Sequence, residues 1–155
     1  MFRMKLVLAG AALALLVGCS PEDEPRSEGG AETADARGKG RVDGRWYTSS
    51  QVTRGRDIFR ENCASCHGAM AQGAPNWREP DANGYYPAPP LNGRGHTWHH
   101  PFPMLRDIVT NGGKQRMPAW GEKLSTADIE AVLAYITSLW PEETYVTWRD
   151  RVNDR

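Results

Sequence analysis

Cys63-Ala64-Ser65-Cys66-His67 has the form C-x-x-C-H, which is the sequence pattern of a c-type haem attachment site. Two thiols three residues apart on one turn can add to the two vinyl groups of a haem and become thioethers. The adjacent histidine then lies beneath the ring, where its imidazole can bind the iron as the proximal ligand. The motif therefore predicts one covalently attached haem c, bound by Cys63, Cys66 and His67.

Two other kinds of site also use a C-x-x-C pair. A redox dithiol of this form occurs in a βαβ setting, and no such pattern surrounds Cys63 and Cys66. A structural zinc ion takes four ligands, and the sequence has no second C-x-x-C pair to complete such a set. Haem attachment is the interpretation that the surrounding sequence favours.

The composition fits a single small domain with a bulky apolar cofactor. A chain of 155 residues suggests one domain, and its formal net charge of zero gives no indication of a nucleic-acid partner. Six tryptophans suit a small interior filled by rings, and a core of this size gains from an added apolar body such as haem. Of the three cysteines, Cys19 lies outside the motif and needs a separate explanation.

The N-terminus predicts export and a lipid anchor. Residues 1–18 combine a basic start with a short apolar run, which is typical of a signal peptide and shorter than the roughly 20 residues of a membrane span. Leu16-Val17-Gly18-Cys19 resembles a bacterial lipobox, which implies cleavage before Cys19 and lipidation of that residue. Ser20 then favours the outer over the inner membrane. An uncleaved anchor and ordinary secretion are the alternatives.

Residues 19–44 are predicted to form a lipid-anchored flexible linker, because they hold almost no large apolar side chains. A flexible chain of about 25 residues has an end-to-end distance of roughly 25–30 Å. Removal of residues 1–18 takes away two basic side chains, so the remaining chain carries a formal charge of about −2. Residues 45–155 are predicted to form the haem domain.

Two longer helices are predicted on either side of the motif. Thr48 to Gln51 has the capping-box pattern and starts a helix that runs to about Cys63. Ser125 to Asp128 starts a second helix, which Pro141 ends. The second helix has an apolar stripe at helical spacing, formed by Ile129, Val132, Leu133, Ile136, Leu139 and Trp140. Residues 142–152 are predicted to add a short helix packed through Tyr145, Val146 and Trp148.

From about residue 47 to residue 140 the chain resembles the class I cytochromes c. In that family a glycine and an aromatic residue precede the first haem cysteine by eight and four positions, and Gly55 and Phe59 hold those places. Val132 and Tyr135 fall where the family's C-terminal helix has a leucine and an aromatic residue. The resemblance implies an all-α class I cytochrome c fold, in which helices wrap one covalent haem and the N- and C-terminal helices cross.

The resemblance also implies further haem contacts. Pro89 matches the family's proline whose carbonyl accepts the Nδ1–H of the haem histidine, here His67, and such a bond orients the imidazole and strengthens it as a donor. Leu91 matches the haem-packing leucine. Met117, followed by Pro118 after a glycine-rich loop, lies 50 residues beyond His67 and matches the distal-ligand segment. Met117 is therefore the predicted second axial ligand of the iron.

Several other residues compete for that position. Met70 follows His67 too closely to reach the other face of the ring, and Met104 is predicted to be a core residue of a helix that begins near Pro103. Three histidines lie close together in the sequence, namely His96, His99 and His100. Either His99 or His100 could replace Met117 as the second axial ligand. The three histidines could also bind a metal or lie beside the haem propionates. A polar turn that caps the next helix is favoured, because no acidic or cysteine partner completes a metal set.

The segment 68–87 is predicted to be a loop, since turn-forming residues occur throughout it. It is longer than in the smallest members of the family. Its rings are expected to pack within the loop rather than to lie at the haem edge; they belong to Trp77, Tyr85 and Tyr86.

Two strong axial ligands leave no open position on the iron, which suits outer-sphere one-electron transfer rather than catalysis at the metal. The expected function is that of a membrane-tethered electron carrier, not an enzyme, on the periplasmic side of the bacterial envelope. Its expected partners are redox proteins, with no small-molecule substrate. The alternatives are an electron-accepting subunit of a periplasmic dehydrogenase or respiratory complex, and a haem sensor or enzyme whose sixth ligand is displaceable.

Overall fold

The computed structural model of this protein describes residues 41–42, 44–114 and 116–153. The predicted signal peptide, the predicted lipidation site Cys19 and most of the predicted linker lie outside the described residues. Within the described ranges the chain is helical, with one isolated bridge between Arg41 and Thr48 and no longer strand, which agrees with the all-α prediction. No helix in these ranges is long and apolar enough to cross a membrane.

Helix α1 (Ser49–Asn62) begins at the predicted capping box. The amide of Gln51 donates to the Thr48 hydroxyl at 3.2 Å, and the amide of Thr48 donates to the Gln51 side chain at 2.9 Å. These reciprocal bonds satisfy two amides that have no partner within the helix. After Cys63 the chain continues directly into the short helix α2 (Ala64–His67), which carries the rest of the C-x-x-C-H motif.

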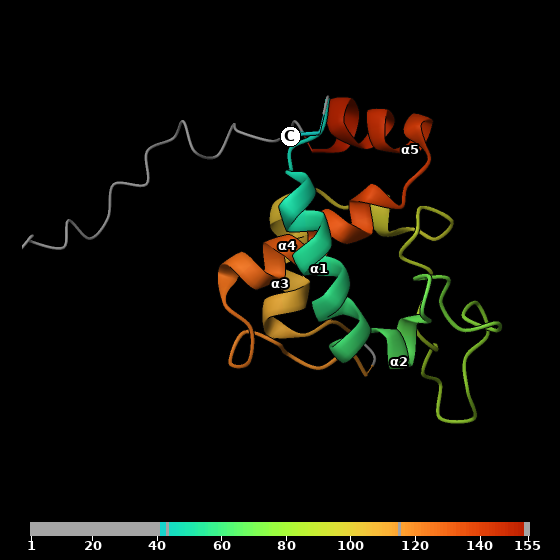
Figure 1. Ribbon diagram of the computed structural model, residues 1–155. Helices are drawn as coiled ribbons and strands as arrows, with labels where there is room; N and C mark the ends of the chain where they lie inside the picture. The colour runs from blue at the N-terminus through green and yellow to red at the C-terminus, as the bar shows by residue number, and fades with distance from the viewer. Residues whose placement is uncertain (1–40, 43, 115, 154–155) are drawn as a thin grey trace, which may run out of the picture. The chain divides into compact units, whose positions relative to one another are not determined.

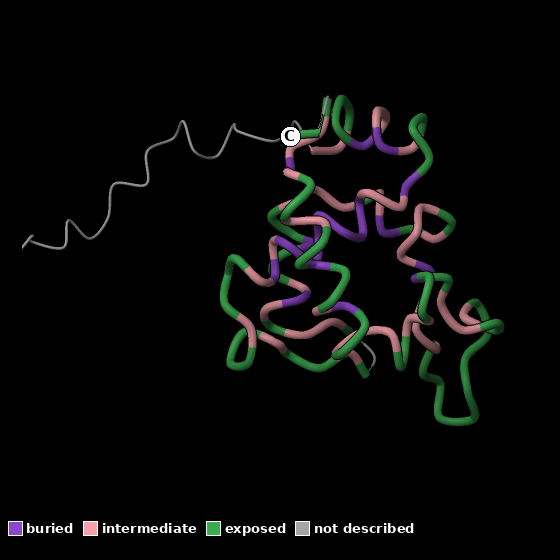
Figure 2. Tube along the Cα trace, in the orientation of Figure 1, coloured by how far each residue is buried: buried purple, intermediate pink, exposed green. Residues whose placement is uncertain are grey.

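Helix α4 (Thr126–Ser138) forms the centre of the domain. Its start is capped as predicted, because the Asp128 amide donates to the Ser125 hydroxyl at 3.2 Å. All seven residues from Ala131 to Thr137 are buried, so the helix is covered on every side rather than along one stripe. Figure 2 shows this buried stretch at the middle of the fold.

Helices α1 and α4 cross at Gly55, as the class I resemblance predicts (Figure 1). A Cβ atom on Gly55 would overlap the Ala131 carbonyl group and lie 3.0 Å from the Val132 amide nitrogen. Only a glycine lets the two backbones approach this closely. One turn further along, the rings of Phe59 and Tyr135 meet with their centres 5.2 Å apart.

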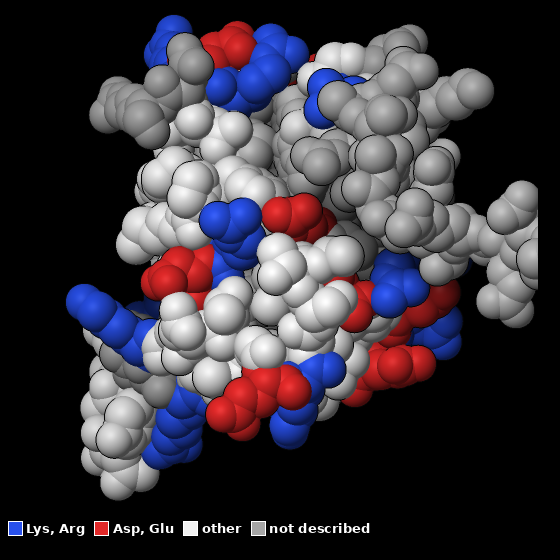
Figure 3. All heavy atoms as spheres, turned by 90° about the vertical axis from the view of Figure 1, so that its left-hand side faces the viewer, with Lys and Arg blue, Asp and Glu red and all other residues white. Residues whose placement is uncertain are grey.

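Charged pairs tie the helices together at the surface. The Arg54 Nε donates to the Asp128 carboxylate at 2.7 Å, which links α1 to α4. Arg106 lies 3.4 Å from Glu130 and links α4 to helix α3 (Phe102–Asn111). Figure 3 shows acidic and basic side chains interspersed on this side of the molecule. Exposed pairs of this kind contribute about 0.2–1 kcal/mol each, so helix packing dominates the stability.

Met104, on α3, was predicted to be a core residue, and this prediction is wrong. Its side chain is 46 % exposed, whereas Leu105 and Val109 of the same helix are buried. Leu105 and Val109 are four residues apart and share one face, and Met104 is turned by about 100° from Leu105. The sequence places several apolar residues on this short helix, so it does not identify which of them faces the core.

The predicted polar turn is present as a 3₁₀ turn, η1 (Thr97–His99). The histidines do not cap α3, however, and that part of the prediction is wrong. The residue before the helix, Pro101, has no side-chain cap, and the first amide, that of Phe102, donates instead to the Asn153 side chain at 2.8 Å. The cap comes from a residue about fifty positions later, which a local sequence pattern does not reveal.

The predicted C-terminal helix is present as α5 (Glu142–Thr147), which continues into a π-helical turn, η2 (Trp148–Val152). Tyr145 and Trp148 are buried, and Figure 1 shows α5 lying across the end of the domain at which α1 begins. The Tyr145 hydroxyl accepts the Trp46 amide at 3.1 Å. Helix α5 thus holds the chain at Trp46, just before α1, through this hydrogen bond.

A Gly55→Ala substitution tests the helix crossing. Alanine at an ordinary helical position stabilises a helix by about 1 kcal/mol relative to glycine. At Gly55 we expect the opposite sign, a loss of about 2–3 kcal/mol, because the added methyl group forces α1 away from Ala131. Urea unfolding of the haem-loaded protein measures the change, with Arg60→Ala on the exposed face of α1 as control. A gain in stability would contradict the observed crossing.

Candidate functional site

The C-x-x-C-H residues lie where α1 passes into α2. Cys63 is half-buried at the junction and packs against the core, whereas Cys66 on α2 is exposed. Neither forms a disulfide. Because residues three apart in a helix share a face, both sulfur atoms lie on one side of this turn.

His67 makes the hydrogen bond that the resemblance implies. Its Nδ1 lies 2.9 Å from the carbonyl oxygen of Pro89. A carbonyl can only accept, so Nδ1 carries the proton and Nε2 keeps its lone pair. Burial lowers the pKa of His67, and the bond to Pro89 opposes that shift without reversing it. The imidazole is therefore neutral at pH 7 and has a defined tautomer, as a metal-binding histidine requires.

Three hydrogen bonds hold the segment Pro89-Pro90-Leu91 in place. The Leu91 amide donates to the Ala71 carbonyl at 2.8 Å, and the Leu91 carbonyl accepts the Trp140 Nε1–H at 2.8 Å. The Thr97 hydroxyl donates to the Pro90 carbonyl at 3.3 Å. The orientation of the Pro89 carbonyl toward His67 is thus set by bonds from three separate parts of the chain.

Two glycines let this proline segment approach the motif. Gly73 has a φ of +74°, and a Cβ atom there would lie 2.5 Å from the Pro90 nitrogen. Its amide donates to the His67 carbonyl at 2.7 Å. A Cβ atom on Gly95 would lie 3.3 Å from the Pro90 carbonyl carbon. A side chain at either position would overlap this proline segment.

The pKa of Cys63 argues against a redox dithiol. Burial raises the pKa of this thiol to about 11, and the neighbouring Cys66 acts in the same direction. Reactive dithiols depend on a lowered thiol pKa, because the thiolate is the nucleophile. A thioether carries no charge at any pH, so it suits this half-buried position better than a thiolate does.

Among the three methionines that follow the motif, Met117 is set apart by its burial. Met70 is 66 % exposed and Met104 is 46 % exposed, whereas Met117 is half-buried and packs against the core. Its sulfur lies 3.4 Å from the position that a Cβ atom on Gly113 would occupy. Gly112, with a φ of +87°, turns the chain so that this loop folds back on itself. The predicted distal ligand thus lies on the inner side of its loop.

The histidine rings make edge-to-face contacts with one another and with a tryptophan. The ring centres of His96 and His100 are 5.8 Å apart, and those of His99 and Trp98 are 4.0 Å apart. Burial lowers the pKa of His100, and the charges of His96 and His99 act in the same direction. The described part of the chain contains no group of three or more His, Cys, Asp or Glu residues placed to hold a metal ion.

The rings of the 68–87 loop contact arginines. The Arg78 guanidinium lies over the Trp77 ring at 4.3 Å, and the Arg116 guanidinium lies over the Tyr85 ring at 4.4 Å. Tyr85 is 43 % exposed, so its ring lies at the surface rather than in the core. No local sequence pattern points to Arg116, because its partner lies more than thirty positions earlier in the chain.

A family model described as cytochrome c oxidase, cbb3-type, subunit III matches residues 50–136, which is more than half of the chain. The chain belongs to this family of c-type cytochromes. The match spans α1 from its second residue, the C-x-x-C-H motif, Met117 and all but the last two residues of α4. Cytochromes of this family carry covalently bound haem c and transfer electrons through it.

Two kinds of relative share this domain. The cbb3-type cytochrome c oxidase subunit CcoP of Azospirillum sp. (strain B510) is 35 % identical over 98 residues, which are 63 % of this chain and 32 % of that protein. The chain thus spans about a third of that relative. Cytochrome c6 of Bryopsis maxima is 31 % identical over 85 residues, which are 53 % of this chain and 84 % of that protein.

Among solved structures, cytochrome CL of Methylophaga aminisulfidivorans aligns with a TM-score of 0.46 and 18 % identity, over 64 % of this chain and 61 % of that one.

A Trp140→Phe substitution tests the support of the proline segment. It keeps most of the ring volume but removes the donor to the Leu91 carbonyl. We expect the free energy of unfolding of the haem-loaded protein to fall by about 1–2 kcal/mol, because the carbonyl loses its partner. Trp77→Phe, in the outer loop, is the control and should change it by less than about 0.5 kcal/mol. Equal effects of the two substitutions would contradict this support.

Proposed function

We propose that this protein is a membrane-tethered one-electron carrier. The observation that carries the proposal is the hydrogen bond from His67 Nδ1 to the Pro89 carbonyl, because it leaves the Nε2 lone pair available to bind iron, beside two thiols at the right spacing. When bound, haem c supplies a one-electron Fe(II)/Fe(III) couple. Cys63 and Cys66 would hold it as thioethers, and Leu91 would pack against it.

Met117 is the residue that we assign to the second axial position. It is the half-buried methionine of the three that follow the motif, and it belongs to the loop that precedes α4. A thioether is a soft ligand that favours the reduced iron, so it raises the redox potential relative to a second histidine. With both axial positions filled by side chains, little has to rearrange when the iron changes its oxidation state. This arrangement suits electron transfer rather than substrate activation.

The family match supports a second role, that of an electron-accepting subunit in a respiratory complex. The CcoP relatives are named as subunits of a cbb3-type oxidase, and this chain aligns with about a third of their length. Electron transfer through the haem would be the same in both roles. A carrier makes small, transient contacts, whereas a subunit stays bound to its partner.

We further propose that the protein is held on the periplasmic side of the bacterial envelope by a lipid on Cys19. Support comes from the lipobox-like sequence before Cys19 and from the polar segment 20–44 that follows it. Ser20 favours the outer membrane. In this arrangement residues 1–18 are removed as a signal peptide, residues 19–44 act as the tether, and residues 45–155 are the haem domain.

Substitution of Met117 by alanine tests the ligand assignment. In the haem-loaded protein we expect loss of the sulfur-to-iron charge-transfer band of the ferric state. We also expect a lower redox potential, within the roughly 0.8 V range over which axial ligands act. Met104→Ala, at an exposed position, should leave both unchanged. An unaltered band in Met117→Ala would point to another methionine as the ligand, and absence of the band from the unmodified protein would point to the histidine cluster. Tight cyanide binding by the unmodified protein would favour a sensor or enzyme.

The Cys19→Ser variant tests the anchor. We expect the protein to move from the membrane fraction to the soluble periplasmic fraction, measured by blotting of fractionated cells and by its absorbance. The carrier role also predicts that the unmodified protein, extracted in mild detergent, migrates without an oxidase. Retention in the membrane fraction of a Cys19→Ser chain that has lost residues 1–18 would contradict the lipid anchor, and stable co-purification with a respiratory complex would favour the subunit role.

A further inference from the structure

After Met117, the loop that carries this residue is hydrogen-bonded to α3. The Trp120 amide donates to the Val109 carbonyl at 3.1 Å, and the Gly121 amide donates to the Thr110 carbonyl at 2.9 Å. These bonds fix the chain three and four residues after Met117. They do not hold the part of the loop before Met117, where Gly112 and Gly113 give the backbone more freedom than other residues would.

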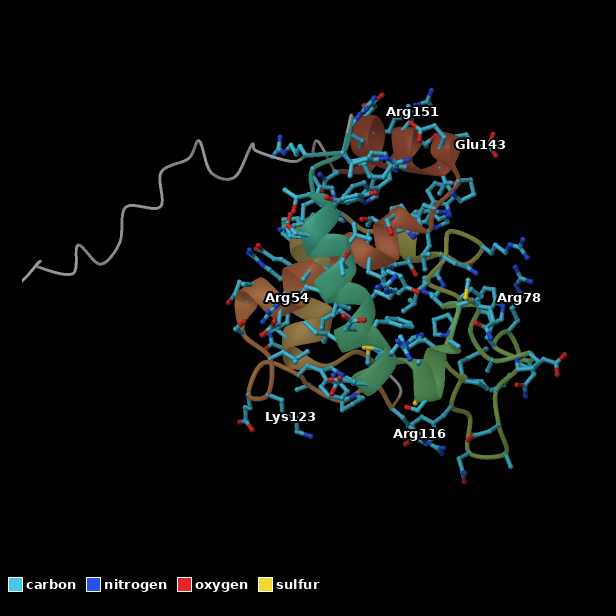
Figure 4. The ribbon with its side chains drawn as sticks, in the orientation of Figure 1. Arg54, Arg78, Arg116, Lys123, Glu143 and Arg151 are labelled. Carbon is cyan, nitrogen blue, oxygen red and sulfur yellow. The ribbon has the colours of Figure 1, made fainter. Side chains whose placement is uncertain are left out.

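Arg116, the residue directly before Met117, reaches out to the 68–87 loop. Its Nη2 lies 3.1 Å from Asp81 Oδ2, and its guanidinium carbon lies 4.4 Å from the centre of the Tyr85 ring. One planar guanidinium thus makes an ion pair and a stacking contact at once, which a lysine does not reproduce. In Figure 4 Arg116 lies at the end of the domain where α1 passes into α2.

Asp81 is held in place by hydrogen bonds that do not involve Arg116. Its Oδ1 accepts the amides of Asn83 at 2.8 Å and of Tyr85 at 3.0 Å, and this Asx turn leaves Oδ2 for Arg116. The Gly84 amide closes the same turn by donating to the Asp81 carbonyl at 2.9 Å. The two side-chain bonds, with a smaller effect of Arg116, lower the pKa of Asp81, so the carboxylate is charged at neutral pH.

We propose that Arg116 is a positioning residue for Met117. Through its contacts with Asp81 and Tyr85, Arg116 holds the loop just before Met117, while the Trp120 amide holds it just after. Consecutive Cα atoms are only about 3.8 Å apart, so an anchored Arg116 confines the backbone of Met117. The contact limits the opening of the loop and so keeps the thioether available to the iron. This inference rests on the proposed role of Met117 as the sixth ligand.

Asp81→Asn is the sharpest variant for the test. The asparagine Oδ1 can still accept both turn amides, so the turn stays intact, while an amide nitrogen replaces the oxygen that pairs with Arg116. Arg116→Gln removes the other partner, and Arg116→Lys keeps the charge without the stacking. Arg78→Gln is the matched control, because it removes a stacked arginine from the same loop without touching Arg116.

The measurement is the affinity of the ferric, haem-loaded protein for imidazole, which must displace Met117. We expect Asp81→Asn and Arg116→Gln each to bind imidazole about two- to five-fold more tightly, the range set by an exposed ion pair. Arg116→Lys should fall between them and the unmodified protein. The double variant should show no further gain, because each substitution already breaks the same contact. Arg78→Gln should not change the affinity.

The direction of the two effects separates positioning from a simple charge effect. Asp81→Asn removes a negative charge and Arg116→Gln removes a positive one, so a purely electrostatic influence on the iron would shift the two variants in opposite directions. A broken contact shifts both in the same direction. Opposite shifts, or affinities equal to that of Arg78→Gln, would overturn the proposal.

The unmodified protein and Met117→Ala separate this inference from the ligand assignment. If the charge-transfer band is present in the unmodified protein, is lost in Met117→Ala and the Asp81 and Arg116 variants bind imidazole normally, the positioning role alone is wrong. If the unmodified protein lacks the band, Met117 is not the ligand and both proposals fall.

Discussion

The close approach of α1 and α4 at Gly55 is the constraint on which the rest of the structure depends. Because no side chain separates the two backbones there, Phe59 and Tyr135 meet one turn further on. That contact places the C-terminal end of α1, and with it Cys63 and the helix that follows. The position of the haem motif is therefore set by helix packing at a point two turns before it, in a part of the domain that carries none of the proposed iron ligands.

The segment that contacts His67 is held by hydrogen bonds to its backbone carbonyls rather than by regular structure. Pro89, Pro90 and Leu91 belong to no helix, yet each carbonyl in this run has a partner, respectively His67, Thr97 and Trp140. Such a segment behaves as a rigid element because its bonds come from three different parts of the chain. The His67 imidazole is therefore connected to α4 through this segment and through Trp140, which follows that helix.

The features predicted correctly from the sequence are those that depend on residues close together in the chain. The capping residues Thr48 and Ser125 act within three positions, so their patterns located the starts of α1 and α4. The family resemblance added the glycine crossing and the proline carbonyl. Contacts between distant residues were missed: Asn153 caps α3, and Arg116 contacts Asp81. Met104 was misplaced because apolar character alone does not identify which side of a short helix is buried.

Helix α1 also sets a distance. Its 14 residues rise about 21 Å, from the bridge between Arg41 and Thr48 at one end to the C-x-x-C-H turn at the other. Anything joined to the chain ahead of Arg41 therefore meets the domain about two nanometres from Cys63. The helix acts as a rigid spacer that keeps the end near Arg41 and Thr48 apart from the motif end. A domain built in this way can be bound at one end while a second molecule approaches the other.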